Sequence, residues 1–274
     1  MTFDLHMHSH FSDGNWSPEE LVDEANNQGL KTIALTDHDT VCGIAQAQVH
    51  AKKYDIEVIP AVEISTQRLG KDLHILAYFI DPANEALKKL LDEQKEIRIE
   101  HVYKLAKSAG VDPSFILNFN VKATIGKAHI AKALVACGAA KDLNEAYFEF
   151  LMPKGKNFIS RNFVDTKRAV KVLSKSGAIP VLAHPPLDNL NSLIEELKEV
   201  GLRGIEAYHA LFGHNTERLL ALAKNYDLLV TGGSDCHGPY PPFAPQLGGV
   251  KMPKFVLENL ASSVFEKRPG VVAI

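Results

Sequence analysis

The sequence predicts an α/β fold in which parallel strands form a barrel with helices around it. Short apolar segments alternate with helical patterns through most of the 274 residues. The repeated order of strand and then helix implies parallel strands joined by right-handed crossovers. The number of such units favours a barrel. A doubly wound open sheet is the alternative, but the G-x-G-x-x-G fingerprint that would favour it is absent after the first apolar segment.

The first third of the chain shows two strand–helix units followed by two further strands. Residues 17–20 form a capping box with Pro18 at the first helical position, which marks the start of a helix. Gly29 ends that helix. In order, we expect strands at residues 3–5, 31–36, 57–62 and 73–79, and helices at about 17–28 and 43–54.

The same alternation returns in the second half of the chain. Each apolar segment there follows an amphipathic one, as in the first third. We expect helices at about residues 166–176, 190–200 and 215–226, strands at 178–183, 204–208 and 228–231, and a last helix after Pro253.

Residues 84–160 break this rhythm and predict a helical insertion. Helical patterns cover about residues 86–109, 126–137 and 144–151, with no convincing strand between them. Loops at one end of a barrel are where insertions reach the active site. We therefore expect a barrel made of residues 1–83 and 161–274, with residues 84–160 as a cap that contributes substrate contacts.

Composition excludes several classes of protein. The chain has 30 Lys and Arg against 33 Asp and Glu, with a formal net charge of −3, so it lacks the basic surface of a protein that binds duplex nucleic acid or membranes. No apolar run approaches the roughly 18 residues of a membrane span, and no signal-peptide pattern opens the sequence. The three cysteines form no C-x-x-C pair, which fits a reducing cytoplasm.

The 12 histidines are the unusual feature of the composition, because several lie beside predicted strand ends. Parallel barrels assemble their active sites at the carboxyl ends of the strands. Two histidines two residues apart on a strand point to the same side, so both can reach one ion. The candidate metal ligands are His6, His8, Asp13, His38, Glu63, His74, His184, Asp235 and His237.

This set of six imidazoles and three carboxylates is too large for one ion and sufficient for two or three with positions left for water and substrate. Glu63 is expected to bridge ions, because its strand lies between the other ligand strands. Three divalent ions would leave a surplus of about three positive charges, a field suited to a phosphate ester. Nitrogen and oxygen ligands without thiolate suit Mn, Zn or Fe.

The spacing of these motifs resembles the PHP (polymerase and histidinol phosphatase) family. The motifs that carry the resemblance are His6-x-His8…Ser12-Asp13-Gly14, Thr36-Asp37-His38-Asp39, Val62-Glu63-Ile64-Ser65, Ala183-His184-Pro185 and Gly233-Ser234-Asp235-x-His237. The resemblance implies a distorted seven-stranded (β/α) barrel that holds up to three metal ions, with Mn preferred and Zn or Fe as alternatives. Because all nine ligand positions are filled, it also implies a competent hydrolase. Asp37 and Asp39 are expected to orient His38.

Three shorter motifs resemble the stand-alone branch of that family, which contains nucleoside 3′,5′-bisphosphate phosphatases and a 5′→3′ exoribonuclease acting on short 5′-phosphorylated RNA. These motifs are Arg98-Ile99-Glu100, the segment 125–131 and Gly204-Ile205-Glu206. The branch more often has Arg-Pro-His where this chain has Lys127-Ala128-His129. Lysine keeps the positive charge but loses the bidentate geometry of arginine.

The resemblance also implies roles for residues outside the metal set. Arg98, Lys127 and His129 are expected to hold a second, non-reacting phosphate and so to set the position of the substrate. His209 and His214 follow a strand at the same barrel end, where they are expected to contact substrate or donate a proton. The nucleophile is expected to be a metal-bound hydroxide, with no separate catalytic residue assigned.

The leading hypothesis is therefore a metal-dependent phosphoesterase whose substrate is a small phosphorylated nucleotide or a short single-stranded RNA. A histidinol-phosphate phosphatase, a related amidohydrolase and a non-catalytic, metal-stabilised RNA-binding module are the alternatives. No duplex or membrane partner is expected. The sequence leaves open the native metal, the length of the substrate and the oligomeric state.

Overall fold

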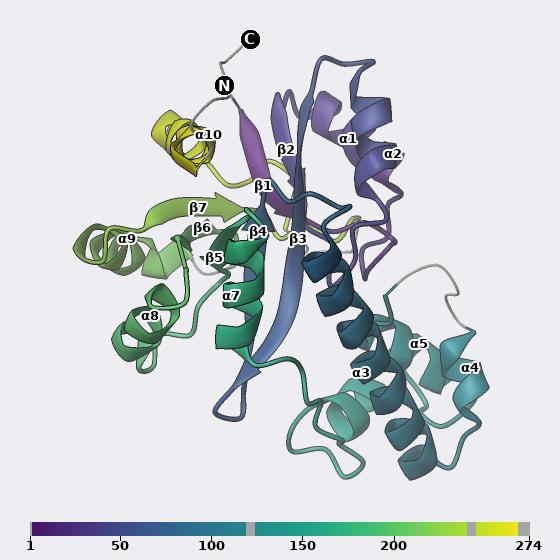
Figure 1. The fold of residues 1–274 in the computed structure, drawn as a ribbon. Helices are drawn as coiled ribbons and strands as arrows, with labels where there is room; N and C mark the ends of the chain where they lie inside the picture. Colours follow the sequence, from purple (N-terminus) through teal and green to yellow (C-terminus); the bar gives the residue numbers. More distant parts are fainter. Residues whose placement is uncertain (1, 119–123, 212, 240–244, 268–274) are drawn as a thin grey trace.

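Seven strands form one sheet that curls into a nearly closed barrel with helices around it (Figure 1), which confirms the predicted α/β barrel. The computed structural model describes residues 2–118, 124–211, 213–239 and 245–267. The order of the strands in the sheet follows their order in the chain. The strands are β1 (Phe3–Met7), β2 (Thr32–Leu35), β3 (Glu57–Arg68), β4 (Lys71–Tyr78), β5 (Ile179–Leu182), β6 (Gly204–His209) and β7 (Leu229–Gly233).

The first and last strands meet and bring the two edges of the sheet together. The Asp235 amide donates to the carbonyl of His6 over 2.9 Å, and the His8 amide donates to the carbonyl of Cys236 over 2.9 Å. Gly233 lies so close to β1 that a Cβ added there would be 2.4 Å from the backbone nitrogen of His6. Closure of the barrel therefore depends on a residue without a side chain at this position.

The expectation of a wholly parallel barrel is wrong at β4, which runs antiparallel to both β3 and β5. β3 extends to Arg68, six residues beyond the predicted end of this strand, and then pairs with β4 as a long hairpin. Leu69 and Gly70 form the tight turn, with φ angles of 49° and 74°. A two-residue turn with both φ angles positive usually contains Asn or Asp before Gly. Because Leu69 stands at that position, the sequence did not predict the turn.

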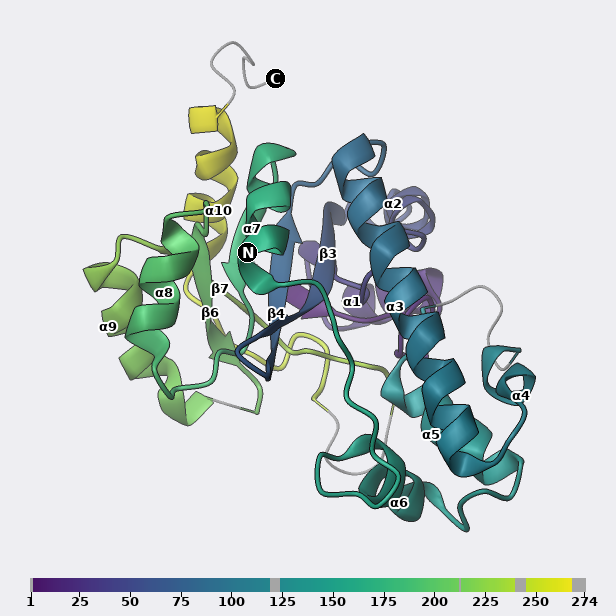
Figure 2. The same cartoon turned by 60° about the horizontal axis from the view of Figure 1, so that its bottom comes forward.

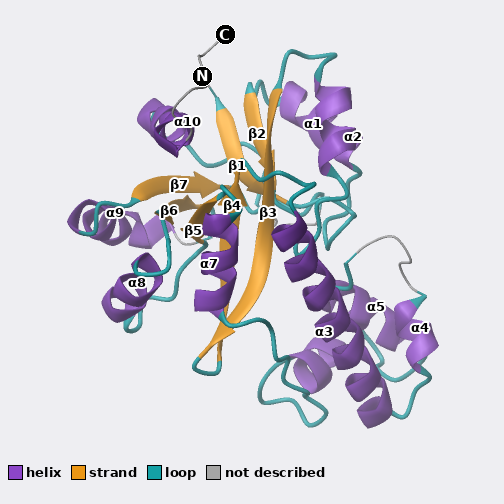
Figure 3. Ribbon diagram, in the orientation of Figure 1, coloured by secondary structure: helices purple, strands orange, loops and turns teal. Residues whose placement is uncertain are grey.

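Six helices cover the outside of the barrel, as Figure 3 shows among the described residues. They are α1 (Pro18–Asn27), α2 (Ile44–Ala51), α7 (Thr166–Lys175), α8 (Leu190–Lys198), α9 (Thr216–Asn225) and α10 (Lys254–Lys267). The predicted capping box of α1 is present: the Glu20 amide donates to Ser17 Oγ, and the Ser17 amide donates to a Glu20 carboxylate oxygen. None of the described helices is long and apolar enough to cross a membrane.

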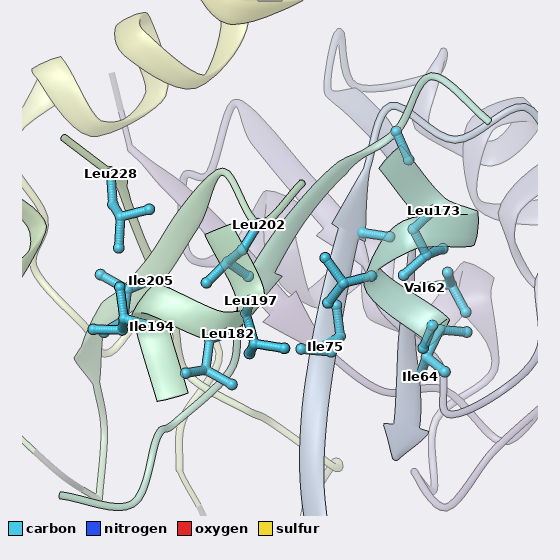
Figure 4. Close-up of a cluster of buried hydrophobic side chains, with 14 of the residues drawn as sticks. Val62, Ile64, Ile75, Leu173, Leu182, Ile194, Leu197, Leu202, Ile205 and Leu228 are labelled. Atoms are coloured by element: carbon cyan, nitrogen blue, oxygen red, sulfur yellow. The ribbon is translucent and has the colours of Figure 1, made fainter. Parts of the chain in front are cut away.

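Successive side chains along β3 face opposite sides of the sheet. Val62 and Ile64 point outward into a core that is shared with Leu173 of α7 and with side chains of α8 (Figure 4). Glu63, between them, therefore points into the barrel. Ser65 lies on the same face as Glu63, and His74 of β4 pairs with Ser65, so this pairing puts His74 on the inner face as well.

Between β4 and α7 the described chain forms several helices (Figure 2), and buried side chains from Val102 to Leu151 form a core of their own. The long helix α3 begins after the N-cap Asn84, whose side chain accepts from two backbone amides, and ends at Gly110 with a φ of 69°. It packs on the barrel through Leu87 and Leu90. The elements of this segment are α3 (Glu85–Ala109), α4 (Pro113–Leu117), α5 (Lys127–Ala136), α6 (Leu143–Ala146) and the π-helical turn η1 (Tyr147–Leu151); α4 was not predicted.

Candidate metal centre

The structure brings all nine predicted ligand residues together at one end of the barrel. Among the described residues, four groups of side chains each have potential ligand atoms within 4.8 Å of one another; one is His6, Glu206 and His209, and the other three consist only of predicted ligand residues. His184 joins them through its Nε2, which lies 3.1 Å from Glu63 Oε1 and 3.3 Å from His74 Nδ1. The three groups are His8, Asp13, His38 and His237; His6, His8, Glu63 and Asp235; and His38, Glu63 and His74.

His74 reaches this end of the barrel because β4 is reversed. In a parallel strand, residues near the start of the strand lie at the end of the barrel opposite the active site. His74 is near the start of β4, but β4 is antiparallel, so its first residues lie at the same end as the last residues of β2 and β5.

Glu63 stands at the centre of the cluster and is fully buried. One of its carboxylate oxygens lies 3.2 Å from a ring nitrogen of His6, of His8 and of His38. The other oxygen lies 3.0 Å from His74 Nδ1 and 3.1 Å from His184 Nε2. Burial on its own would raise the pKa of Glu63, but the surrounding imidazoles, led by His38 and His6, hold it well below its usual range. The carboxylate therefore stays ionised.

Two further carboxylates flank Glu63 from different loops. Asp235, after β7, places Oδ1 3.1 Å from His8 Nε2 and 3.3 Å from His6 Nε2. Asp13, in the loop after β1, places Oδ1 3.2 Å from His237 Nε2. Burial opposes ionisation of both groups, but the neighbouring histidines hold the pKa of each well below its usual range.

Several atoms of the cluster converge without bonding one another. Among the described residues, both ring nitrogens of His8, the Nδ1 of His38 and the Oδ1 of Asp13 are buried and have no hydrogen-bond partner. Buried polar atoms rarely remain unsatisfied unless an ion or water completes them. Burial would lower the pKa of His8, yet Asp235 and Glu63 raise it to about 10. The centre thus favours positive charge, and its nitrogen and oxygen atoms fit divalent cations.

Glu206 of β6 has a role that sequence reasoning missed. It is fully buried; its Oε1 lies 2.8 Å from His6 Nδ1, and its Oε2 accepts from the His184 amide over 2.7 Å. A carboxylate that accepts from one ring nitrogen leaves the other nitrogen free to bind a metal. The signal in the sequence was a carboxylate inside the otherwise apolar segment 204–208.

Asp37 and Asp39 are occupied by groups other than His38, so their expected role is wrong. Asp37 accepts from the Ser9 amide over 2.7 Å and from the Ser9 hydroxyl over 2.6 Å. Asp39 accepts from the Ser65 amide over 2.9 Å and from two nitrogens of Arg98. These bonds fix the loops that carry His8 and His38 rather than the imidazoles themselves.

Arg98 lies inside the protein and not on an open surface, with only 5% of the residue exposed. Its guanidinium donates to Asp39 Oδ2 through Nε at 2.9 Å, to Ser65 Oγ at 2.8 Å and to the Ile125 carbonyl at 2.9 Å. These bonds join α3 to β3 and to the segment before α5, and the expectation that Arg98 also holds a substrate phosphate stays a prediction.

The other residues expected to contact substrate occupy different positions. Lys127 is the first residue of α5, and His129 Nδ1 accepts from the Gly126 amide over 3.2 Å, so His129 caps that helix. The helix start adjoins the cluster, because a Cβ added to Gly126 would be 3.2 Å from Asp13 Cβ.

His209 and His214 were expected together, but the structure separates them. His209 Nε2 lies 3.4 Å from Asp235 Oδ2, and its Nδ1 accepts from the Leu211 amide over 3.1 Å. The neutral ring therefore carries its proton on Nε2. His214 is exposed on the 3₁₀ turn η2 (Gly213–Asn215) and contacts none of the nine cluster residues among the described parts of the chain.

Comparison with known proteins identifies relatives of the whole chain. A model of the PHP domain matches residues 4–153. A 5′-3′ exoribonuclease of Haemophilus influenzae is 32% identical, over 86% of this chain and 90% of its own length. A 3′,5′-nucleoside bisphosphate phosphatase of Chromobacterium violaceum is 32% identical, over 86% of this chain and 87% of its own.

Two solved structures share the fold across nearly the full length. A protein of Bifidobacterium adolescentis, assigned as a metal-dependent phosphoesterase, superposes with a TM-score of 0.84 at 28% identity and 95% coverage of both chains. A protein of Chromobacterium violaceum, described as an amidohydrolase with bound sulfate and no metal, gives a TM-score of 0.83 at 28% identity and 96% coverage of both chains.

Proposed function

The chain belongs to the PHP family of metal-dependent phosphoesterases, and from this premise we propose that its substrate is a nucleotide that carries a second phosphate. A nucleoside 3′,5′-bisphosphate and a short 5′-phosphorylated RNA both meet that description. A relative named as a 5′-3′ exoribonuclease and one named as a 3′,5′-nucleoside bisphosphate phosphatase are each 32% identical to this chain. The observation that carries the proposal is the cluster of nine metal-type side chains beside a segment with Lys127 at a helix start.

The nine clustered side chains are the proposed ligands of two or three divalent ions. Glu63 is the proposed bridge, since its two oxygens face five imidazoles at 3.0–3.2 Å. Buried, unsatisfied atoms of His8, His38 and Asp13 support a cation at the centre. Ligands that are nitrogen and oxygen without sulfur suit Mn²⁺, with Zn²⁺ or Fe²⁺ as alternatives.

Protein groups around the centre have separate tasks in the proposed reaction. When bound, the ions supply Lewis acidity toward a phosphoryl oxygen and toward water. Glu206 holds the tautomer of His6, and Nε2 of His209 lies 3.4 Å from Asp235 Oδ2. Because that nitrogen carries the proton, His209 is placed to donate a hydrogen bond to an oxygen of the phosphoryl group or of the leaving group.

The test is hydrolysis of adenosine 3′,5′-bisphosphate and of a short 5′-phosphorylated RNA by the Mn²⁺-supplemented protein. His8→Ala and Asp235→Ala should each abolish turnover while nucleotide binding is partly retained, because both residues belong to the proposed metal centre and neither is among the residues expected to hold the second phosphate. His50→Ala, on α2 and paired with Asp23 at 2.6 Å, is the matched control and should retain activity.

Two outcomes would reject the substrate assignment. If neither nucleotide is hydrolysed although metal is bound, the proposed substrate class is wrong. If histidinol phosphate is hydrolysed faster than both nucleotides in the same assay, the chain is a histidinol-phosphate phosphatase.

A further inference from the structure

Asp4 is a buried carboxylate in β1 that the proposed reaction does not use. Its neighbours Phe3 and Leu5 belong to an apolar cluster that β1 shares with α10, and only 1% of Asp4 is exposed. Burying a carboxylate is costly unless its oxygens accept hydrogen bonds. The donors that surround Asp4 therefore indicate what its burial achieves.

Both oxygens of Asp4 accept from backbone amides. Oδ1 accepts from the Ser234 amide over 2.9 Å and from the His6 amide over 3.3 Å. Oδ2 accepts from the Gly248 amide over 2.8 Å. Ser234 directly follows β7, and Gly248 lies between β7 and α10. One side chain thus holds the chain on both sides of the ligand-bearing segment 235–237.

The backbone of Asp235 needs such support, because it lies in the left-handed region with a φ of 55°. A residue with a side chain keeps this conformation only where its surroundings fix it. The amide before it, that of Ser234, is bonded to Asp4. The Asp235 amide itself donates to the His6 carbonyl over 2.9 Å. Two consecutive amides are therefore tied to β1, and Asp235 Oδ1 lies 3.3 Å from His6 Nε2 and 3.1 Å from His8 Nε2.

The chain that returns at Gly248 also packs against the ligand motifs. Gly248 has a φ of 72°, which glycine adopts without strain. Leu247 is only 3% exposed and belongs to the same apolar cluster as Met7 and Cys236, each of which lies between two proposed metal ligands. The bond from Gly248 to Asp4 therefore joins β1 to a segment that is also packed against the first and the last ligand motif.

We propose that Asp4 is a positioning residue of the metal centre. Its carboxylate holds the chain on both sides of Asp235 and His237 and so fixes these two ligands relative to the histidines at the end of β1. An aspartate suits this task, because its two oxygens accept from different segments at once. The assignment rests on the proposed function in that the cluster binds divalent ions, but it does not depend on which phosphate ester is the substrate.

Asp4→Asn tests this role, because asparagine keeps the size of the side chain but has a single acceptor oxygen. Oδ1 and Oδ2 accept from different segments, so one of the two bonds must be lost and two N–H groups would face each other. Mn²⁺ binding, measured by calorimetric titration of the metal-depleted protein, should weaken about tenfold or more. The visible absorption spectrum of the Co²⁺-loaded protein reports the arrangement of the ligands and should differ from that of the parent protein.

Leu197→Ala, in α8, is the control for a loss of stability alone. Leu197 is fully buried in the core that packs against the outside of the barrel, so its truncation should lower the midpoint of urea denaturation. The Mn²⁺ affinity and the Co²⁺ spectrum should stay unchanged. If Asp4→Asn behaves in the same way, with a lower midpoint but unchanged metal binding and spectrum, the positioning role is rejected.

Gly248→Ala tests the same role if Asp4→Asn does not fold. The added Cβ would lie 3.0 Å from Leu30 Cδ2, on a backbone with a φ of 72°, so the Gly248 amide is displaced from Asp4 while β1 and β7 keep their residues. Mn²⁺ affinity should fall in Gly248→Ala and not in Gly177→Ala, where φ is +89° and nothing lies within 4 Å. Equal affinities in these two variants reject the role.

None of these measurements requires turnover, so they separate the role of Asp4 from the proposed activity. If metal binding changes as expected while neither nucleotide is hydrolysed, Asp4 keeps its role and the proposed substrate class is rejected. If nucleotides are hydrolysed and Asp4→Asn leaves metal binding unchanged, the proposed function stands and the role of Asp4 is rejected.

Discussion

Glu206 determines which nitrogen of His6 faces the proposed metal centre. The carboxylate lies 2.8 Å from His6 Nδ1, so it accepts the proton of that nitrogen. The lone pair of Nε2 then points toward Glu63 and Asp235, whose oxygens lie 3.2 and 3.3 Å away. Because Glu206 also accepts from the His184 amide, one buried side chain orients two of the proposed ligands.

Replacing Glu206 by Gln should weaken Mn²⁺ binding about 10- to 100-fold, because the amide has no charge and no longer fixes the tautomer of His6. Calorimetric titration of the metal-depleted protein with Mn²⁺ measures this. Glu217→Gln, an exposed position in the first turn of α9, is the matched control and should bind Mn²⁺ as the parent protein does. Unchanged affinity in Glu206→Gln would show that His6 is oriented without this carboxylate.

The cluster residues were predictable one by one, whereas their supporting partners were not. Each of the nine residues follows, or lies within, an apolar segment that reads as a strand, so its place in the fold follows from local sequence. Arg98 also stood out in the sequence, but its partner Asp39 is 59 residues away. Which acceptor a buried arginine finds depends on how two distant elements pack, and no local pattern records that.

At the scale of elements, α3 is fastened to the barrel by a buried polar junction. Asp39, after β2, accepts from Gln94 and Arg98 of α3, and both residues also bond Ser65 of β3. The Asp39 backbone has a positive φ of 52°. The junction holds α3, and the segment that leads to α5, against the strand that carries Glu63.

Removing one partner of the Arg98–Asp39 pair should cost about 3–5 kcal/mol of unfolding free energy, because the other charge stays buried without its counter-ion. Arg98→Met and Asp39→Asn should each show this loss in urea denaturation. The double variant should lose less than the sum of the two, because the pair is removed together. The exposed Lys104–Glu100 pair of the same helix, at 2.7 Å, is the control and should contribute well under about 1 kcal/mol. Additive losses would mean that the pair is not coupled.

Apart from α4 and the end of β3, the helices and strands lie where the sequence predicted them, but the direction of β4 was not predicted. The strand at residues 73–79 was expected, but its reversal depends on a two-residue turn of Leu69 and Gly70, which carries only part of the usual signal. The reversal nevertheless explains the position of His74. In a parallel strand, His74 would lie at the end of the barrel opposite the cluster. Strand direction is a property of the turn, and the apolar pattern of the strand does not contain it.

At the scale of the whole molecule, closure of the barrel assembles the proposed centre. His6 and His8 come from the first strand and its end, whereas Asp235 and His237 follow the last strand, more than 200 residues later. The two edges are joined by the Asp235–His6 and His8–Cys236 backbone hydrogen bonds. Ligands from both ends of the chain therefore reach each other only when β1 and β7 lie side by side.

Gly233→Ala should disrupt this closure, because the added Cβ would lie 2.4 Å from both the nitrogen and the Cβ of His6 and 2.8 Å from Asp4 Oδ1. We expect a loss of at least about 3 kcal/mol of unfolding free energy, measured by urea denaturation of the metal-depleted protein. Gly29→Ala is the control: its φ is +70° and nothing lies within 4 Å, so only the cost of a left-handed backbone, about 1–2 kcal/mol, applies. Since His6 and Asp235 flank the closure, Mn²⁺ affinity should fall in Gly233→Ala and not in Gly29→Ala. Equal losses of stability with equal Mn²⁺ affinity in the two variants would show that the proposed centre does not depend on close contact between β1 and β7.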